Sequence, residues 1–285
     1  MKYFLVLLFL VSTLYGFDID IYNSTIANGK TAMIEFKKEK SVSYDKILAG
    51  KKSYKIYQHP TNSRKMYVLL PINYYEKPSD QKVEILYKED EKEMSKTVFF
   101  RIEDGKYKKE AIKVQKSKVN PTAKKVKERI SKEYAEAMKI YATCTDESYV
   151  DSKFIAPMDS KITSAFGKAR VYNDSLKGYH SGTDYRAKIG TPIKASNDGV
   201  VVLVKDRFYA GGTVILNHGR GIYTCYYHMS KFDVEMGQKV AKAEIIGLSG
   251  DTGRVTGPHL HFSARVGGEQ VDPLQLIQLL NAKLF

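Results

Sequence analysis

Short apolar runs recur through most of this chain of 285 residues, and turn residues separate them. Before position 105 the runs lie at 31–36, 65–70, 83–87 and 97–102, next to Asn-Gly, Pro and Asp-Gly turns. Runs this short are typical of strands rather than helices. Their spacing predicts a small β-sandwich-like domain over 17–105.

Glycine becomes frequent after about residue 154, and strand-like runs return at 199–204, 213–216, 222–227 and 260–266. These runs predict a second, mostly antiparallel β domain over 151–285, closed by a short helix at 274–280. Two domains also suit the length, since a domain takes roughly 100–200 residues. The chain is therefore expected to be mainly β.

The segment between the two β domains, 106–150, differs in kind. Asn120-Pro121-Thr122 is a helix-start signal, because proline is tolerated in the first turn. After it, apolar residues recur at three- and four-residue steps, namely Val126, Ile130, Tyr134, Met138 and Tyr141. The pattern predicts a connecting amphipathic helix of about twenty residues that packs on a neighbouring domain.

The net charge of +14 is concentrated in this connector. Residues 106–142 carry 12 basic and 4 acidic side chains, which is more than half of the excess. Nucleic-acid binding would need basic residues interleaved with aromatics on one face of a known module, and none is evident, so we expect no nucleic-acid partner. Attraction of the connector to an anionic polymer or membrane surface and a simple solvated helix face both stay open.

The first sixteen residues look like an export signal. Lys2 is followed by nine apolar residues at 3–11 and by the small Gly16. Nine apolar residues are about half of the roughly 20 that span a bilayer, so we expect no stable membrane anchor. The pattern predicts a signal peptide over 1–16 and a periplasmic protein. That compartment permits a disulfide, but the alternating run around Cys225 favours a small buried hydrophobe over a bond to Cys144.

Five of the six histidines fall between 180 and 261. His180 and Asp184 stand four residues apart, His228 ends a predicted strand, and His259 and His261 flank Leu260. Positions two apart on a strand project from one face, so His259 and His261 should point together while Leu260 enters the core.

Two imidazoles on one face suit a metal site, or a metal ligand beside a general base. Catalytic zinc usually takes three protein ligands and keeps one position open for water. Asp184 offers the carboxylate, but spacing alone does not say which of His259 and His261 would bind the metal. The residues by themselves predict a metallohydrolase. His59 precedes Pro60 and is expected in a surface turn.

Five segments carry a family resemblance: Ser164-Ala-Phe-Gly167, His180-Ser-Gly-Thr-Asp184, Asn217-His218-Gly219, Tyr226-Tyr-His-Met229 and Gly253-Arg-Val-Thr-Gly-Pro-His-Leu-His-Phe262. In this order they closely resemble the M23 (lysostaphin/LytM-type) zinc metallopeptidases, which cut peptide bridges in bacterial cell-wall peptidoglycan. The similarity runs from about 154 to 273. The preceding sandwich and basic helix resemble the N-terminal module of many Gram-negative members.

The resemblance implies that His180, Asp184 and His261 bind Zn²⁺ and that His228 and His259 are the catalytic histidines. It implies a peptidoglycan substrate and DD-endopeptidase activity on D-alanine–diaminopimelate cross-links in wall remodelling and cell shape, with DD-carboxypeptidase activity as a further hypothesis. The alternative is a non-catalytic LytM-type activator of other wall hydrolases.

Three further hypotheses concern the surroundings of this site. The N-terminal domain is expected to make a regulatory contact that occludes the catalytic groove. His218 is expected to pack near the site without binding the metal. For Tyr172, a reach to the oxyanion and a core or loop role both stay open.

Overall fold

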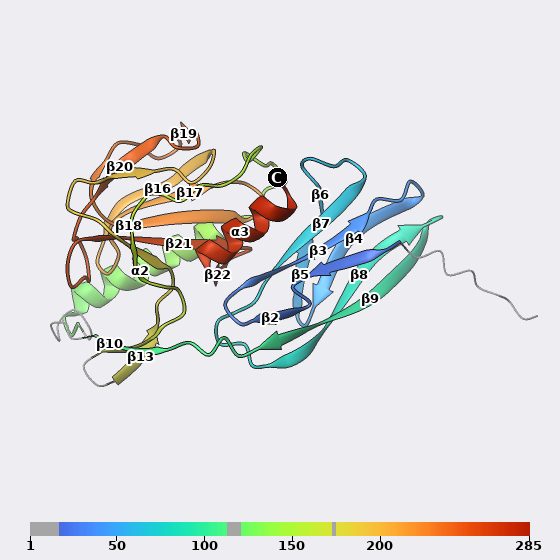
Figure 1. The fold of residues 1–285 in the computed structure, drawn as a ribbon, viewed down its shortest axis with the longest axis horizontal. Helices are drawn as coiled ribbons and strands as arrows, with labels where there is room; N and C mark the ends of the chain where they lie inside the picture. The colour runs from blue at the N-terminus through green and yellow to red at the C-terminus, as the bar shows by residue number, and fades with distance from the viewer. Residues whose placement is uncertain (1–16, 113–120, 173–174) are drawn as a thin grey trace, which may run out of the picture.

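The computed structural model describes residues 17–112, 121–172 and 175–285 (Figure 1). The predicted signal peptide over 1–16 lies outside this part of the chain. Most of the described elements are strands, and the two helices of the described chain are α2 (Lys124–Tyr141) and α3 (Pro273–Lys283). The expectation of a mainly β protein is confirmed.

The N-terminal region forms two sheets. One has the order β1-β3-β7-β6 and the other β2-β9-β8-β4-β5. Their bounds are β1 (Ile19–Tyr22), β2 (Thr25–Ala27), β3 (Thr31–Lys37), β4 (Val42–Ala49), β5 (Lys52–Lys55), β6 (Tyr57–Gln58), β7 (Lys65–Pro71), β8 (Ser79–Glu89) and β9 (Lys92–Glu103). Ile34 and Val68 from the first sheet and Ile47 and Ile85 from the second share one buried cluster. Inward residues of both sheets thus make the core of a sandwich.

A ten-stranded sheet forms the C-terminal region, with the main order β11-β14-β21-β18-β17-β16-β19. Its strands are β11 (Ile162–Ser164), β14 (Thr183–Arg186), β15 (Pro192–Lys194), β16 (Gly199–Arg207), β17 (Gly211–Asn217), β18 (Ile222–Phe232), β19 (Lys239–Val240), β20 (Ile245–Ser249), β21 (His259–Val266) and β22 (Glu269–Val271). All its pairings are antiparallel, as expected. Helix α3 follows Asp272, whose carboxylate accepts hydrogen bonds from the backbone N–H groups of Leu274 and Gln275.

The sandwich and the large sheet share a buried core. Met33, Tyr67 and Leu69 of the sandwich pack in one cluster with residues of β22 and α3 such as Val271 and Leu280. Figure 1 shows α3 and β22 on the side of the large sheet that faces the sandwich. Burial of apolar surface from both regions in one cluster holds them in a defined arrangement.

His59 is part of this contact, so its prediction as a surface residue was wrong. The side chain is only 6% exposed, and its Nε2 lies 2.8 Å from the carbonyl oxygen of Lys283 at the end of α3. The Glu35 carboxylate lies 3.5 Å away. The turn before Pro60 is covered because α3 packs against it, a contact between segments far apart in the sequence.

Helix α2 begins a few residues later than the Asn-Pro-Thr signal and ends at Tyr141. Its buried side chains are Glu133, Ala137 and Tyr141, whereas Tyr134 is 64% exposed, so the predicted apolar stripe was wrong at Tyr134. The cause is the buried Glu133 carboxylate, which accepts hydrogen bonds from the Phe208 backbone N–H at 2.9 Å and from Arg129 at 2.6 Å. Neither described helix is long and apolar enough to cross a membrane.

The connector also contains a strand that the sequence did not predict. β10 (Lys109–Ile112) pairs in parallel with β12 (Ala169–Tyr172), which pairs with β13 (Ser175–Tyr179). The chain therefore touches the C-terminal region before α2 begins. Both cysteines are free: Cys225 is fully buried beside the Tyr141 hydroxyl, as expected for a small hydrophobe, and Cys144 is exposed.

Candidate metal centre

The antiparallel register of β14 and β21 brings the predicted site residues together. Asp184 lies opposite His261, and Arg186 lies opposite His259. Leu260, between the two histidines, is fully buried in the core. His259 and His261 both approach the Asp184 Oδ1 atom, at 3.7 and 2.8 Å, so the alternation expected from the pleat is confirmed.

Three side chains converge on one point. His180 Nε2 lies 2.9 Å from Asp184 Oδ1 and 3.0 Å from His261 Nδ1. These three residues are buried, and their ligand atoms are mutually close enough to hold one metal ion. Gly182 makes the approach possible, because a Cβ there would lie 2.6 Å from the His261 ring. Two imidazoles and one carboxylate match the three protein ligands of catalytic zinc sites.

The hydrogen bonds around His180 show that this donor set fits a cation. Its Nδ1 lies 2.8 Å from the Ala165 carbonyl oxygen, and because a carbonyl only accepts, Nδ1 carries the proton. The Nε2 lone pair therefore faces the Asp184 oxygen. Two electron-rich atoms at this distance repel each other unless a cation or a proton lies between them.

His228 and His259 stand beside this cluster as a pair, with ring centroids 4.8 Å apart. The Nδ1 atom of His228 lies 2.8 Å from the Thr252 carbonyl oxygen, and that of His259 lies 2.8 Å from the Gly257 carbonyl oxygen. Each ring thus has its proton on Nδ1 and a basic Nε2. His228 also has φ of +63°, a left-handed backbone conformation that is uncommon for a residue other than glycine.

Burial sets the charge of the cluster. Burial alone would raise the pKa of Asp184, but the imidazoles of His180 and His261 beside its carboxylate hold this pKa well below its usual range. Burial lowers the pKa of His261 to about 4. Burial, and then the neighbouring His261 and His259, lower the pKa of His228 well below its usual value. At neutral pH these groups are a carboxylate and neutral imidazoles, the forms that bind metals and accept protons.

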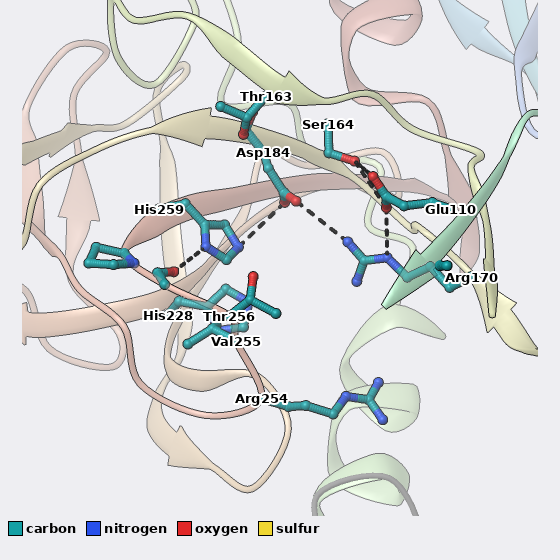
Figure 2. Close-up of a pocket in the computed structure, with 13 residues that line it drawn as sticks. Glu110, Thr163, Ser164, Arg170, Asp184, His228, Arg254, Val255, Thr256 and His259 are labelled. Atoms are coloured by element: carbon teal, nitrogen blue, oxygen red, sulfur yellow. Dashed lines mark hydrogen bonds and ion pairs between the residues drawn. The ribbon is translucent and has the colours of Figure 1, made fainter. Parts of the chain in front are cut away.

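A cavity of about 410 Å³ opens beside the histidine pair (Figure 2). Its lining includes Asp184, His228 and His259, and also two arginines, Arg170 and Arg254. Sequence reasoning missed the arginines, because neither stands in a metal-ligand pattern.

A third missed residue, Glu110, lines the cavity from β10 in the connector. Its carboxylate lies 2.9 Å from Lys168 Nζ and 3.8 Å from Arg170 Nε, and it accepts a hydrogen bond from Ser164 at 3.4 Å. No local signal marks Glu110, since only the β10–β12 pairing brings it to the site. The described residues of 17–105 do not line this cavity.

His218 does not lie near the site, which corrects that expectation. It lies in the turn between β17 and β18, where its backbone N–H donates a hydrogen bond to the carbonyl oxygen of Ile222. His228 lies six residues further along β18 than Ile222, which is about 20 Å at 3.3 Å per residue. Its ring contacts the Asp198 carbonyl oxygen at 2.6 Å and Thr224 Oγ1 at 2.7 Å. The side chain of Tyr172 lies outside the described part of the structure.

The model of peptidase family M23 matches residues 178–273, the segment that carries His180, Asp184, His228, His259 and His261. The chain carries an M23 metallopeptidase domain.

The names of similar proteins agree with this family assignment. A protein of Vibrio cholerae named peptidoglycan DD-endopeptidase ShyA is 46% identical over 122 residues, which are 42% of this chain and 28% of ShyA. A protein of Neisseria meningitidis named DD-carboxypeptidase/endopeptidase Mpg is 43% identical over 117 residues, 41% of this chain and 27% of Mpg. The chain thus spans less than a third of the length of these curated relatives.

The crystal structure of a putative peptidase M23 from Pseudomonas aeruginosa resembles the whole molecule. The TM-score is 0.68 at 26% identity, over 88% of this chain and 94% of the other. The similarity therefore extends beyond the M23 domain into the sandwich.

Proposed function

We propose that this M23 protein is a zinc-dependent peptidoglycan hydrolase that cuts the stem-peptide cross-links of the bacterial cell wall. The observation that carries the proposal is the convergence of His180, Asp184 and His261 beside the paired imidazoles of His228 and His259. The names of the relatives ShyA and Mpg support peptidoglycan as the substrate.

His180, Asp184 and His261 would hold the zinc ion. When bound, zinc polarises a substrate carbonyl and makes a water molecule more acidic. His180 is oriented for this role by Ala165, whose carbonyl fixes the proton on Nδ1.

His228 and His259 would move the protons. The carbonyl oxygens of Thr252 and Gly257 keep each Nδ1 protonated, so each Nε2 can accept a proton from attacking water and return it to the leaving amine. The low pKa of His228 keeps it in the basic form at neutral pH. A protonated imidazole beside the scissile bond would also stabilise the developing oxyanion.

The bond we propose is the D-alanine–diaminopimelate amide, which makes the protein a DD-endopeptidase with additional DD-carboxypeptidase activity. The apolar run at 3–11 supports export to the periplasm, where this substrate lies. The biological role would be cell-wall remodelling and control of cell shape.

Digestion of purified peptidoglycan tests this proposal. Zinc-loaded protein is expected to convert cross-linked muropeptide dimers to monomers, measured by mass spectrometry, and His259→Ala should abolish the conversion. Persistence of the dimers with zinc-loaded wild type would overturn the endopeptidase function.

The alternative is a non-catalytic activator of other wall hydrolases, and the presence of all five site residues argues against it. His261→Ala separates the two functions. An enzyme loses its activity in cells with this change, whereas an activator keeps it.

A further inference from the structure

We propose that Arg170 and Arg254 form a subsite for a free carboxylate on the leaving-group side of the scissile amide. The inference rests on the proposed function and adds a chemical requirement on the substrate. Both arginines line the cavity that contains Asp184, His228 and His259. Figure 2 shows Arg170 and His259 on opposite sides of Asp184, and Arg254 on the same side as Arg170.

Two carboxylates hold Arg170 in place. Its Nη2 lies 3.5 Å from Asp184 Oδ2, and its Nε lies 3.8 Å from the Glu110 carboxylate. The Asp184 oxygen that faces His180 and His261 is the other one, Oδ1. The Arg170 guanidinium is therefore separated from the proposed metal position by the width of one carboxylate. The Arg170 side chain is 20% exposed, so it is neither fully enclosed nor free to swing into solvent.

Arg254 comes from the loop before β21. Its backbone N–H bonds the Tyr209 carbonyl oxygen at 2.9 Å, and its guanidinium lies 4.3 Å from the centre of the Tyr209 ring. A guanidinium is planar, and its N–H groups lie along its edge. Such edges match the two oxygens of a carboxylate.

The charges of the described lining residues favour an anion once metal is bound. Glu110 and Asp184 balance Arg170 and Arg254, so a divalent cation leaves an excess of two positive charges in the cavity. The positive groups lie on the side away from His259 (Figure 2). An anionic substrate group would therefore be attracted to that side.

The proposed substrate has a carboxylate at the matching place. In a D-alanine–diaminopimelate cross-link, the carbon that bears the scissile nitrogen also bears a free carboxylate. The terminal D-alanine released by a DD-carboxypeptidase has the same arrangement. With the scissile carbonyl at the metal, this carboxylate lies a few bonds away, on the leaving-group side. A glycine–glycine bridge has no charged group at this position.

Two muropeptide dimers test the subsite, one with this carboxylate free and one with it amidated. The zinc-loaded wild-type protein should cut the free dimer with a kcat/KM about 10- to 100-fold higher, the range expected for charge-assisted hydrogen bonds. Arg254→Gln should lose about that factor on the free dimer, mainly through KM, and should cut the amidated dimer as the wild type does. Arg254→Lys keeps the positive charge but cannot form two parallel hydrogen bonds to a carboxylate. Its kcat/KM on the free dimer should therefore lie between those of the wild type and Arg254→Gln.

Arg254 is the diagnostic residue because Arg170 also contacts the metal ligand Asp184. The matched control is Arg101→Gln, a surface arginine on β9 paired with Asp80, which should leave both rates unchanged. Zinc content of each variant is measured alongside.

Three results would overturn the subsite. The wild type cutting both dimers equally would show that the carboxylate is not recognised, and an equal fall on both dimers in Arg254→Gln would show a merely structural role. Failure of zinc-loaded wild type to cut either dimer would overturn the proposed function, and this inference with it.

Discussion

The M23 domain should lose stability as the pH falls, because of the buried side chain of His218. The ring is buried, and its Nδ1 donates to the Asp198 carbonyl oxygen while its Nε2 accepts from the Thr224 hydroxyl. The Tyr226 hydroxyl lies 3.0 Å from that same Thr224 oxygen and accepts a hydrogen bond from the Ser196 backbone N–H. This chain of hydrogen bonds is complete with a neutral imidazole, and a second ring proton would break it.

Burial lowers the pKa of His218 from 6.5 to about 4. The unfolded chain therefore binds the proton more readily than the folded protein does, and stability falls as the pH drops below 6.5. The full effect is about 3 kcal/mol, reached below pH 4, and about 2 kcal/mol of it is lost between pH 7 and pH 5. The contribution of this residue is intact above pH 6.5.

Urea unfolding at pH 7 and pH 5, followed by circular dichroism, measures this effect. His218→Gln removes the titrating group and leaves an amide that can form hydrogen bonds. Both proteins are studied with EDTA, so that release of bound metal does not contribute to the pH dependence. All groups other than residue 218 are the same in both proteins and cancel in the comparison. The wild type should lose about 2 kcal/mol more than the variant between the two pH values. Equal losses would refute the assignment of the acid response to His218.

Four other outcomes are expected. Glu110→Gln should weaken zinc binding about 10- to 100-fold in chelator competition, because Glu110 orients Arg170 beside Asp184, and unchanged affinity would exclude that role. Tyr67→Ala should destabilise the protein by about 3–5 kcal/mol in calorimetry, since this ring is 2% exposed in the core shared by the two regions. Zinc at 1,000 times its dissociation constant should add about 4 kcal/mol of stability, and His180→Ala should show no such gain. The regulatory hypothesis predicts that deleting residues 17–105 raises activity, and unchanged or lower activity would reject it.

The sequence determined the elements and the local geometry of the site. A pleated strand alternates its side chains, so the pattern His-Leu-His already places two imidazoles on one face and Leu260 in the core. Glycine, proline and asparagine signals bounded eight predicted strands, and each of the eight lies within an observed strand, because turns depend on local backbone preferences. The alternating run around Cys225 predicted its burial for the same reason.

Only the tertiary structure decided which distant segments meet. The β14–β21 register sets Asp184 opposite His261, and the β10–β12 pairing brings Glu110 to the cavity. Packing of α3 buries His59, and in α2 the carboxylate of Glu133 is buried next to Tyr134, which the apolar stripe predicted to be buried. Local sequence periodicity does not predict these contacts, because the two partners of each contact are tens to hundreds of residues apart in the sequence.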